Sequence, residues 1–284
     1  MEVKNVGVLG AGQMGAGIAQ VFAAKDFKVK LVDVSANMLK TAQEGIGNSC
    51  ERLIKKNLMT AEQKTKLLAN ISTSVLLKDF NACDFVVEAV SENLNLKLEI
   101  FKEMDQIAPK HAILTSNTSS ISITRIAAAT KRPEKIAGMH FMNPVPLMKL
   151  VEGIRGLQTS DETFNVMASL VTKLDKTLVV SKDMPGFIVN RILMPMINEA
   201  VFALYEGLGS VNDIDQAMKL GTNQPMGPLT LADFIGLDTC LAILKVLHEG
   251  LGDPKYRPCP LLTKYVEAGW LGKKTGRGFY NYEV

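Results

Sequence analysis

The first part of the chain alternates short apolar runs with longer amphipathic segments. The apolar runs have the length and the residue types of strands, at positions 3–9, 28–32, 85–87, 112–114, 136–139 and 177–180. Between them, apolar residues recur at helical spacing, most clearly over 37–58, 94–107 and 163–174. Strands that alternate with helices form parallel sheets, because each connecting helix packs back onto the sheet. The pattern predicts an α/β domain with a doubly wound, mostly parallel sheet.

The pattern changes after residue 180. Residues 181–186 are polar and end in Pro185-Gly186, which is typical of a break between structural units. Helical patterns follow at 187–205, 211–220, 229–248 and 260–268, with Gly and Pro between them. We predict a sheet domain over 1–184 and a smaller, all-helical domain over 185–284. Pro195 should kink the first of these helices, because proline lacks a backbone donor.

Composition narrows the class of protein. Of the 284 residues, 47% are hydrophobic and 21% charged, which is typical of a globular protein, and the net charge is only +3. Basic and acidic residues are interspersed, so we expect no nucleic-acid partner. No apolar stretch reaches about 20 residues and no export signal is recognisable, so we expect a cytoplasmic protein with no membrane partner. The four cysteines form no C-x-x-C pair, which favours reduced thiols and no metal site.

A glycine turn follows the first predicted strand and opens the first predicted helix. Gly10 permits the tight turn, Gly12 lets the backbone approach a pyrophosphate, and Gly15 allows close packing of helix on sheet. Asp33 ends the second strand, about 20 residues on, where a carboxylate accepts from the ribose hydroxyls. A glycine turn with an unrelated surface Asp is the alternative, but the order of elements favours a Rossmann-type dinucleotide site. Val34 offers no charge to a 2′-phosphate, so NAD is favoured over NADP, while FAD stays open at this point.

The strand at 136–139 leads into a candidate acid/base group. His140 stands at its carboxyl end, where open α/β sheets bind ligands, and a Pro-rich turn follows. Glu152 lies further on, where a returning chain would bring its carboxylate beside the imidazole. Such a carboxylate fixes the tautomer and favours the imidazolium, which suits a general acid/base. On spacing alone, a core histidine and an unrelated surface glutamate remain the alternative.

Two other polar groups interrupt apolar surroundings. The cluster 116–120 follows a strand, so its hydroxyl and amide groups are placed to touch cofactor or substrate; simple helix capping by Ser120 or Ser122 is the alternative. Asn190 interrupts an apolar helix just after the domain boundary and needs polar partners. On the long helix of 37–58, basic side chains near Lys56 could pair with phosphates or form a solvated face. We assign no chemistry to His111 or His248.

Several longer motifs contain these residues: Gly10-Ala11-Gly12-Gln13-Met14-Gly15, Ser116-Asn117-Thr118-Ser119-Ser120, the stretch from His140 to Glu152, Pro185-Gly186-Phe187-Ile188-Val189-Asn190-Arg191, Met226-Gly227-Pro228 and Gly272-Lys273-Lys274-Thr275-Gly276. Together they resemble the L-3-hydroxyacyl-CoA dehydrogenase family of fatty acid metabolism, in its short, single-function form. Within that family the sequence is similar to the clostridial 3-hydroxybutyryl-CoA dehydrogenases of butyrate and butanol fermentation. The resemblance runs nearly end to end.

The resemblance implies an oxidoreductase that transfers a hydride reversibly between an (S)-3-hydroxyacyl-CoA and the 3-ketoacyl-CoA, such as acetoacetyl-CoA, with NAD as cofactor. It implies that His140 is the catalytic base, Glu152 its paired carboxylate, and Ser119 and Asn190 substrate contacts. The residues that it implies for cofactor binding are Gly10, Gly12, Gln13, Met14, Gly15, Asp33, Glu92, Lys97, Ser119, Asn143 and Lys274.

The resemblance also implies contacts between coenzyme A and both Ser49 and Lys56. It implies a homodimer formed through the C-terminal helical domain, which would also contact the substrate. Two other functions are weighed against this one. A β-hydroxy acid dehydrogenase that does not use coenzyme A would have no use for Ser49 and Lys56. A non-catalytic relative, similar to lens crystallins, would have no use for His140 and Glu152.

Overall fold

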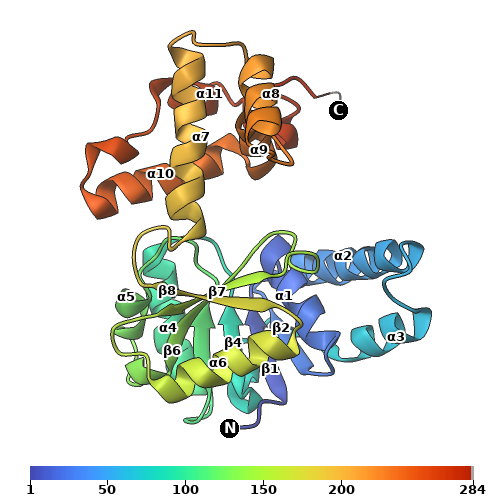
Figure 1. Ribbon diagram of the computed structural model, residues 1–284. Coiled ribbons are helices and arrows are strands. Elements are labelled where there is room, and N and C mark those ends of the chain that lie inside the picture. The colour runs from blue at the N-terminus through green and yellow to red at the C-terminus, as the bar shows by residue number, and fades with distance from the viewer. Residues whose placement is uncertain (283–284) are drawn as a thin grey trace. The chain divides into compact units, whose positions relative to one another are not determined.

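The computed structural model describes residues 1–282, and the chain divides into two compact units. The first unit is Met1–Met184 and the second is Pro185–Val284 (Figure 1). The first contains a sheet with helices, and the second is built of helices, as the sequence pattern predicts. Each unit has its own hydrophobic core.

The sheet of the first unit has eight strands in the order β3-β2-β1-β4-β5-β6-β7-β8. Their bounds are Asn5–Leu9, Lys28–Val32, Ile71–Ser74, Phe85–Glu88, Ile113–Ser116, Ile136–Phe141, Leu150–Arg155 and Thr177–Lys182, numbered β1 to β8 in chain order. All neighbours pair in parallel except β6 and β7, which are antiparallel. The prediction of a doubly wound, mostly parallel sheet is confirmed. Strand order reverses between β1 and β4, the position at which such sheets bind ligands.

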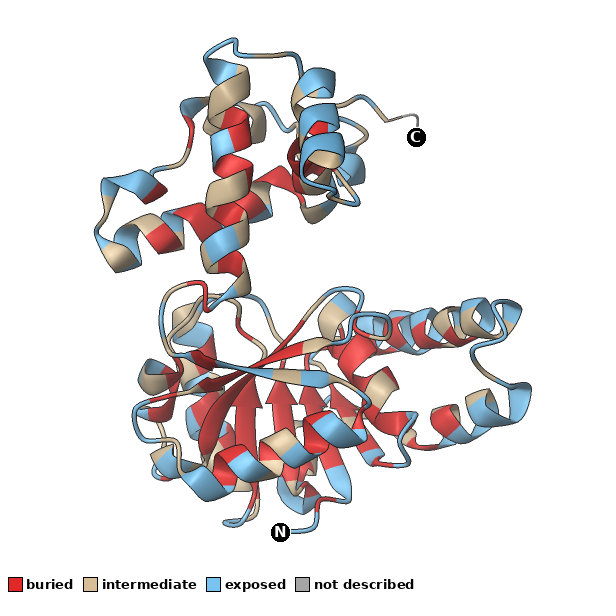
Figure 2. Ribbon diagram, viewed as in Figure 1, coloured by how far each residue is buried: buried red, intermediate tan, exposed pale blue. Residues whose placement is uncertain are grey.

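The sheet is buried at its centre and covered by helices on both faces (Figure 2). Strands β4, β5 and β6 are buried along their whole length. Val6 and Val8 point from β1 into a core that also contains Phe22. On the other face, a Cβ on Gly7 would lie 2.8 Å from the ring of Phe80. The helices of this unit are α1 Gln13–Ala23, α2 Ala36–Lys55, α3 Ala61–Ala69, α4 Leu94–Ile107, α5 Ile123–Ala127 and α6 Asp161–Lys173.

Sequence patterns missed some short or polar elements of this unit. Strand β3 has the sequence ISTS and lies at the edge of the sheet, so it has no apolar run to detect. Helix α3 is polar but begins with a capping box formed by Thr60 and Gln63. The helix predicted over 37–58 is α2, which ends at Lys55 because Asn57 turns the chain with a φ of 56°. The side chain of Ser122 caps α5. Helix capping by Ser120 or Ser122 is the alternative given above for this serine-rich segment.

The described part of the second unit, residues 185–282, packs five α-helices, with the bounds α7 Val189–Tyr205, α8 Val211–Gly221, α9 Pro228–Ile235, α10 Leu237–Leu251 and α11 Pro260–Glu267. The single helix predicted over 229–248 is wrong. Gly236 breaks it into α9 and α10 because its φ of 102° is incompatible with a continuous helix. Pro195 lies inside α7, as expected; the kink stays a prediction.

Candidate active site

The glycine turn joins β1 to α1 with the geometry of an anion-binding loop. Gly10 has a φ of 98°, and a Cβ on Gly15 would lie 1.7 Å from the Gly10 carbonyl oxygen, so both positions require glycine. Gly12 is the N-cap of α1 and borders open space, with nothing within 4 Å of where its Cβ would be. Among the described residues, no side chain caps this helix start. The first backbone N–H groups of α1, from Gln13 and Met14, are therefore suited to a pyrophosphate.

Asp33 lies against this turn. Its Oδ2 accepts from the Ala11 backbone N–H at 2.8 Å, and its Oδ1 accepts from the Ser35 N–H at 2.9 Å. Each carboxylate oxygen has a second lone pair, so the side chain can still accept from ribose hydroxyls. Val34 beside it is 94% exposed and provides no positive charge. The turn and Asp33 thus fit the adenosine half of a dinucleotide without a 2′-phosphate.

His140 and Glu152 form a buried pair across β6 and β7. The two residues are directly opposite in the antiparallel register, and His140 Nδ1 is 2.8 Å from Glu152 Oε2. The exposed fraction of His140 is 7% and that of Glu152 is 0%. The alternative of an unrelated surface glutamate therefore fails. With the carboxylate accepting at Nδ1, the imidazole carries its proton there and Nε2 becomes the nitrogen suited to proton exchange.

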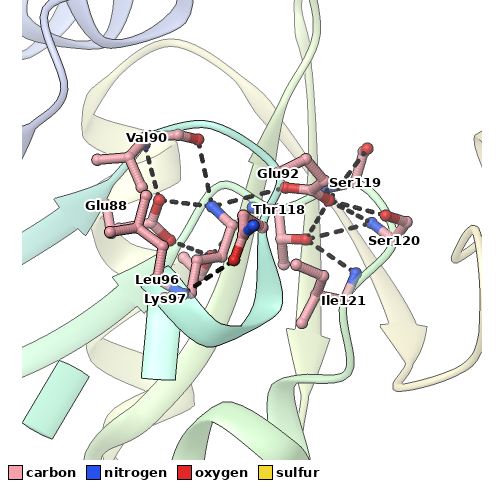
Figure 3. A network of polar contacts seen from close by, with 11 residues as sticks. Glu88, Val90, Glu92, Leu96, Lys97, Thr118, Ser119, Ser120 and Ile121 are labelled. Atoms are coloured by element: carbon pink, nitrogen blue, oxygen red, sulfur yellow. Dashed lines mark hydrogen bonds and ion pairs between the residues drawn. The ribbon is translucent and has the colours of Figure 1, made fainter. Parts of the chain in front are cut away.

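The carboxylate of Glu92 is hydrogen-bonded to three residues of the serine cluster, Thr118, Ser119 and Ser120 (Figure 3). Its Oε1 accepts from the backbone N–H groups of Ser119 at 3.0 Å and Ser120 at 3.1 Å, and from the hydroxyls of Ser120 and Thr118. Burial alone would raise the pKa of Glu92, but the ammonium of Lys97 and these hydrogen bonds outweigh it and hold the pKa below its usual range. Glu92 is therefore charged at neutral pH.

Lys97 is next to this cluster and is only 1% exposed. Its Nζ lies 2.5 Å from Glu88 Oε1, 3.5 Å from Glu92 Oε2 and 3.3 Å from the Val90 carbonyl oxygen. Glu88 was not among the predicted site residues. It is a charged residue that directly continues the apolar run 85–87, at the carboxyl end of a central strand, and that position is the signal in the sequence.

Asn143 belongs to the turn between β6 and β7, and its peptide bond to Pro144 is cis. Lys176 supports this turn by donating to the carbonyl oxygens of Val145 at 2.7 Å and Met148 at 2.6 Å. Asn143 thus lies shortly after His140 in the chain, on a turn that the hydrogen bonds of Lys176 hold in place. Its contact with a cofactor stays a prediction.

Ser49 and Lys56 lie at the C-terminal end of α2. Ser49 is half-buried in the helix, and Lys56 is its exposed C-cap. They are seven positions apart, so they fall on one face of a helix. Their role toward coenzyme A stays a prediction.

Asn190 and Lys274 belong to the second unit. Asn190 is largely buried in the first turn of α7. Lys274 lies in the short 3₁₀ helix Lys273–Thr275, where its Nζ pairs with Asp238 Oδ1 at 2.6 Å. Both residues are thus held within the helical unit, on segments next to glycine turns at Gly186 and Gly276.

Other expectations from the sequence concern metals, thiols and membranes. All four cysteines are free and buried. Within residues 1–282, no group of His, Cys, Asp and Glu side chains is arranged to hold a metal ion. Nor does any helix in that range have the length and hydropathy needed to span a membrane. His111 is exposed and lies 3.2 Å from Asp84.

Two family models match the chain, one for each unit. The model described as "3-hydroxyacyl-CoA dehydrogenase, NAD binding domain" matches residues 5–184. The model described as "3-hydroxyacyl-CoA dehydrogenase, C-terminal domain" matches residues 186–282. The two matches leave only a few residues of the chain uncovered.

Individual proteins match over the same length. A 3-hydroxybutyryl-CoA dehydrogenase of Bradyrhizobium diazoefficiens is 59% identical over 280 residues, which are 99% of this chain and 96% of the relative. One from Clostridioides difficile is 46% identical over 286 residues, 98% of this chain and 99% of the relative. The crystal structure of (S)-3-hydroxybutyryl-CoA dehydrogenase from Ralstonia eutropha has a TM-score of 0.96 at 50% identity, with all of both chains covered.

Proposed function

Because the chain belongs to the 3-hydroxyacyl-CoA dehydrogenase family across both of its units, we propose that it interconverts (S)-3-hydroxybutyryl-CoA and acetoacetyl-CoA. Family membership makes it an NAD-dependent oxidoreductase acting on 3-hydroxyacyl-CoA. Specificity for a four-carbon acyl group goes beyond family membership. Relatives named 3-hydroxybutyryl-CoA dehydrogenase, at 59% and 46% identity, support it.

The buried pair of His140 and Glu152 is the observation that carries the mechanism. When NAD is bound, its nicotinamide supplies the hydride acceptor in one direction and, as NADH, the donor in the other. In oxidation, Nε2 of His140 takes the proton of the 3-hydroxyl as the hydride leaves C3. In reduction, the same nitrogen returns the proton to the developing alkoxide. The Glu152 carboxylate stabilises the imidazolium that forms in oxidation.

The remaining predicted residues hold and orient the reactants. We assign Ser119 and Asn190 to the oxygen atoms of the substrate, where their contribution is orientation and electrostatics. The glycine turn and Asp33 bind the adenosine half of the cofactor, and the other cofactor residues are Glu92, Lys97, Ser119, Asn143 and Lys274. Ser49 and Lys56 are assigned to coenzyme A. A control assay with free acetoacetate in place of acetoacetyl-CoA tests whether coenzyme A is needed.

We also propose a homodimer formed through the helical unit. Large apolar side chains are exposed there on several helices and turns, including Ile192 at 66%, Leu208 at 82% and Leu220 at 81%. Exposed apolar surface of this kind is typical of subunit interfaces. Light scattering after size-exclusion chromatography should give twice the mass of one chain; the mass of a single chain would contradict it.

The four free thiols support a reducing, cytoplasmic setting.

The decisive experiment is reduction of acetoacetyl-CoA, followed by oxidation of NADH, with NADPH in parallel. The wild type should turn over with NADH and much more slowly with NADPH. His140→Gln should lower kcat by about 10²–10⁴-fold, the usual contribution of general acid/base catalysis, while NADH still binds. His111→Gln, at an exposed histidine, is the matched control. No activity in the wild type would refute the function, and near-normal activity in His140→Gln would refute the role of His140.

A further inference from the structure

Glu88 is a buried carboxylate for which the proposed mechanism has no role. It ends β4 and has no exposed surface. Its Oε1 accepts from the Val90 N–H at 2.7 Å and from Lys97 Nζ at 2.5 Å (Figure 3). Its Oε2 accepts from the Ser116 hydroxyl at 2.6 Å. Removing a carboxylate from water is costly, and an apolar residue at this position would avoid that cost. The full set of donors indicates an ionised side chain held in one geometry.

The position of Glu88 ties it to the cofactor site. Its register partners are Leu9 of β1 and Ser116 of β5, so it lies where the strand order of the sheet reverses. Directly beyond it, the Ala89 N–H donates to the Leu9 carbonyl oxygen at 2.7 Å, and a Cβ on Gly10 would lie 2.6 Å from the Ala89 carbonyl oxygen. The end of β4 is therefore packed against the glycine turn. Dinucleotides cross such sheets at this point.

Two carboxylates compete for one ammonium in this cluster. Lys97 Nζ is 2.5 Å from Glu88 and 3.5 Å from Glu92, so Glu88 is its main partner. Glu92 is thereby left to hold the backbone of Ser119 and Ser120. Without the charge of Glu88, the buried ammonium would have Glu92 as its one carboxylate in the cluster. It would then draw Glu92 away from the serine turn.

We propose that Glu88 is a positioning residue for the cofactor site, which acts through Lys97 to keep Glu92 on the serine turn. The other carboxylate oxygen of Glu88 accepts from the Ser116 hydroxyl, which in turn accepts from the Thr118 N–H at 3.1 Å. Glutamine at this position keeps an oxygen that can accept from Ser116, so Glu88→Gln isolates the effect that passes through Lys97. The inference rests on the proposed assignment of Glu92, Lys97 and Ser119 to the cofactor. With no exposed surface, Glu88 is not placed to touch either reactant, and its effect is on the charge and the geometry of the residues assigned to the cofactor.

The test measures NADH binding by fluorescence titration, without any acyl-CoA. Glu88→Gln should raise the Kd for NADH by about 10-fold, within the range of coupling between contacting residues, and should raise the KM for NADH more than it lowers kcat. Glu99→Gln, at an exposed position on the same helix as Lys97, is the matched control and should bind NADH as the wild type does. Wild-type affinity in Glu88→Gln would overturn the proposal.

A double-mutant cycle separates positioning from loss of fold. If Glu88 acts through Lys97, the Glu88→Gln, Lys97→Gln double variant should bind NADH as Lys97→Gln alone does, to within about 2-fold. This double variant leaves no unpaired buried ammonium, so it stays informative if Glu88→Gln does not fold. A double variant that binds NADH much more weakly than Lys97→Gln alone would overturn the proposal. Because NADH binding is read without substrate, a wild type that binds NADH but does not reduce acetoacetyl-CoA would refute the proposed reaction and leave this test intact.

Discussion

Replacing Glu152 with glutamine tests the proposed acid/base pair most directly. The substitution keeps the size of the side chain and removes its negative charge at a fully buried position. The partner, His140 Nδ1, is 2.8 Å away. The glutamine amide nitrogen can also donate to Nδ1, which would move the imidazole proton to Nε2 and leave the wrong tautomer for a base.

The size of the effect follows from the charge pair. Two unit charges about 4 Å apart interact by about 4 kcal/mol at an effective dielectric constant of about 20. This interaction stabilises the imidazolium that forms as the substrate is oxidised, so it is lost from the transition state. Since about 1.36 kcal/mol corresponds to a tenfold change in rate, kcat for oxidation of 3-hydroxybutyryl-CoA should fall by about 10³-fold.

The assay is steady-state oxidation of (S)-3-hydroxybutyryl-CoA by NAD, with NADH binding measured separately by fluorescence. Glu152→Gln should bind NADH normally, because Glu152 is assigned no contact with the cofactor. Glu162→Gln, at an exposed position in the first turn of α6, is the control for loss of a carboxylate. A kcat within about tenfold of the wild type would refute the reasoning, since general acid/base groups contribute about 10²–10⁴-fold.

Three further predictions concern cofactor choice and stability. Asp33→Asn combined with Val34→Arg removes a repulsive charge and adds an attractive one, so kcat/KM with NADPH should rise by at least about tenfold in the NADPH assay; no gain would argue against Asp33 at the ribose. Phe22→Ala removes a fully buried ring whose centroid lies 5.5 Å from that of Phe27. It should lower the free energy of unfolding in urea by about 3–5 kcal/mol, and a loss below about 1 kcal/mol would contradict the packing. Asp84→Ala should destabilise the protein at pH 7, and less so at pH 3. Burial alone would raise the pKa of Asp84, but hydrogen bonds from the Asn5 and Lys4 N–H groups and from His111 outweigh it and lower the pKa. A carboxylate whose folded pKa is lowered stabilises the fold above its unfolded pKa of about 3.9, and that stabilisation is lost as the pH falls through the folded value. Urea unfolding at both pH values measures the difference, and an equal loss at both would contradict the role of the charge.

Local pattern was enough for elements whose apolar positions repeat regularly. Helix α4, Leu94–Ile107, begins and ends where its sequence pattern predicts, and the glycine turn lies between strand and helix as its motif requires. Local pattern failed where an element carries little periodic apolar content, as in β3 with its ISTS sequence. It also failed where a single glycine breaks an apolar helix, as at Gly236 between α9 and α10.

The candidate site likewise combines residues that the local sequence identifies with contacts that only the structure shows. The sequence by itself determined the α/β class, the dinucleotide turn with Asp33, and the candidates His140 and Glu152, because each depends on residues near one another in the chain. Only the tertiary structure decided that Glu152 is buried directly opposite His140, because strand pairing sets that contact. It also showed what Glu88 contacts, since its partner Lys97 lies on the next helix. A buried charge is recognised by what surrounds it, and those surroundings come from distant segments that only folding brings together.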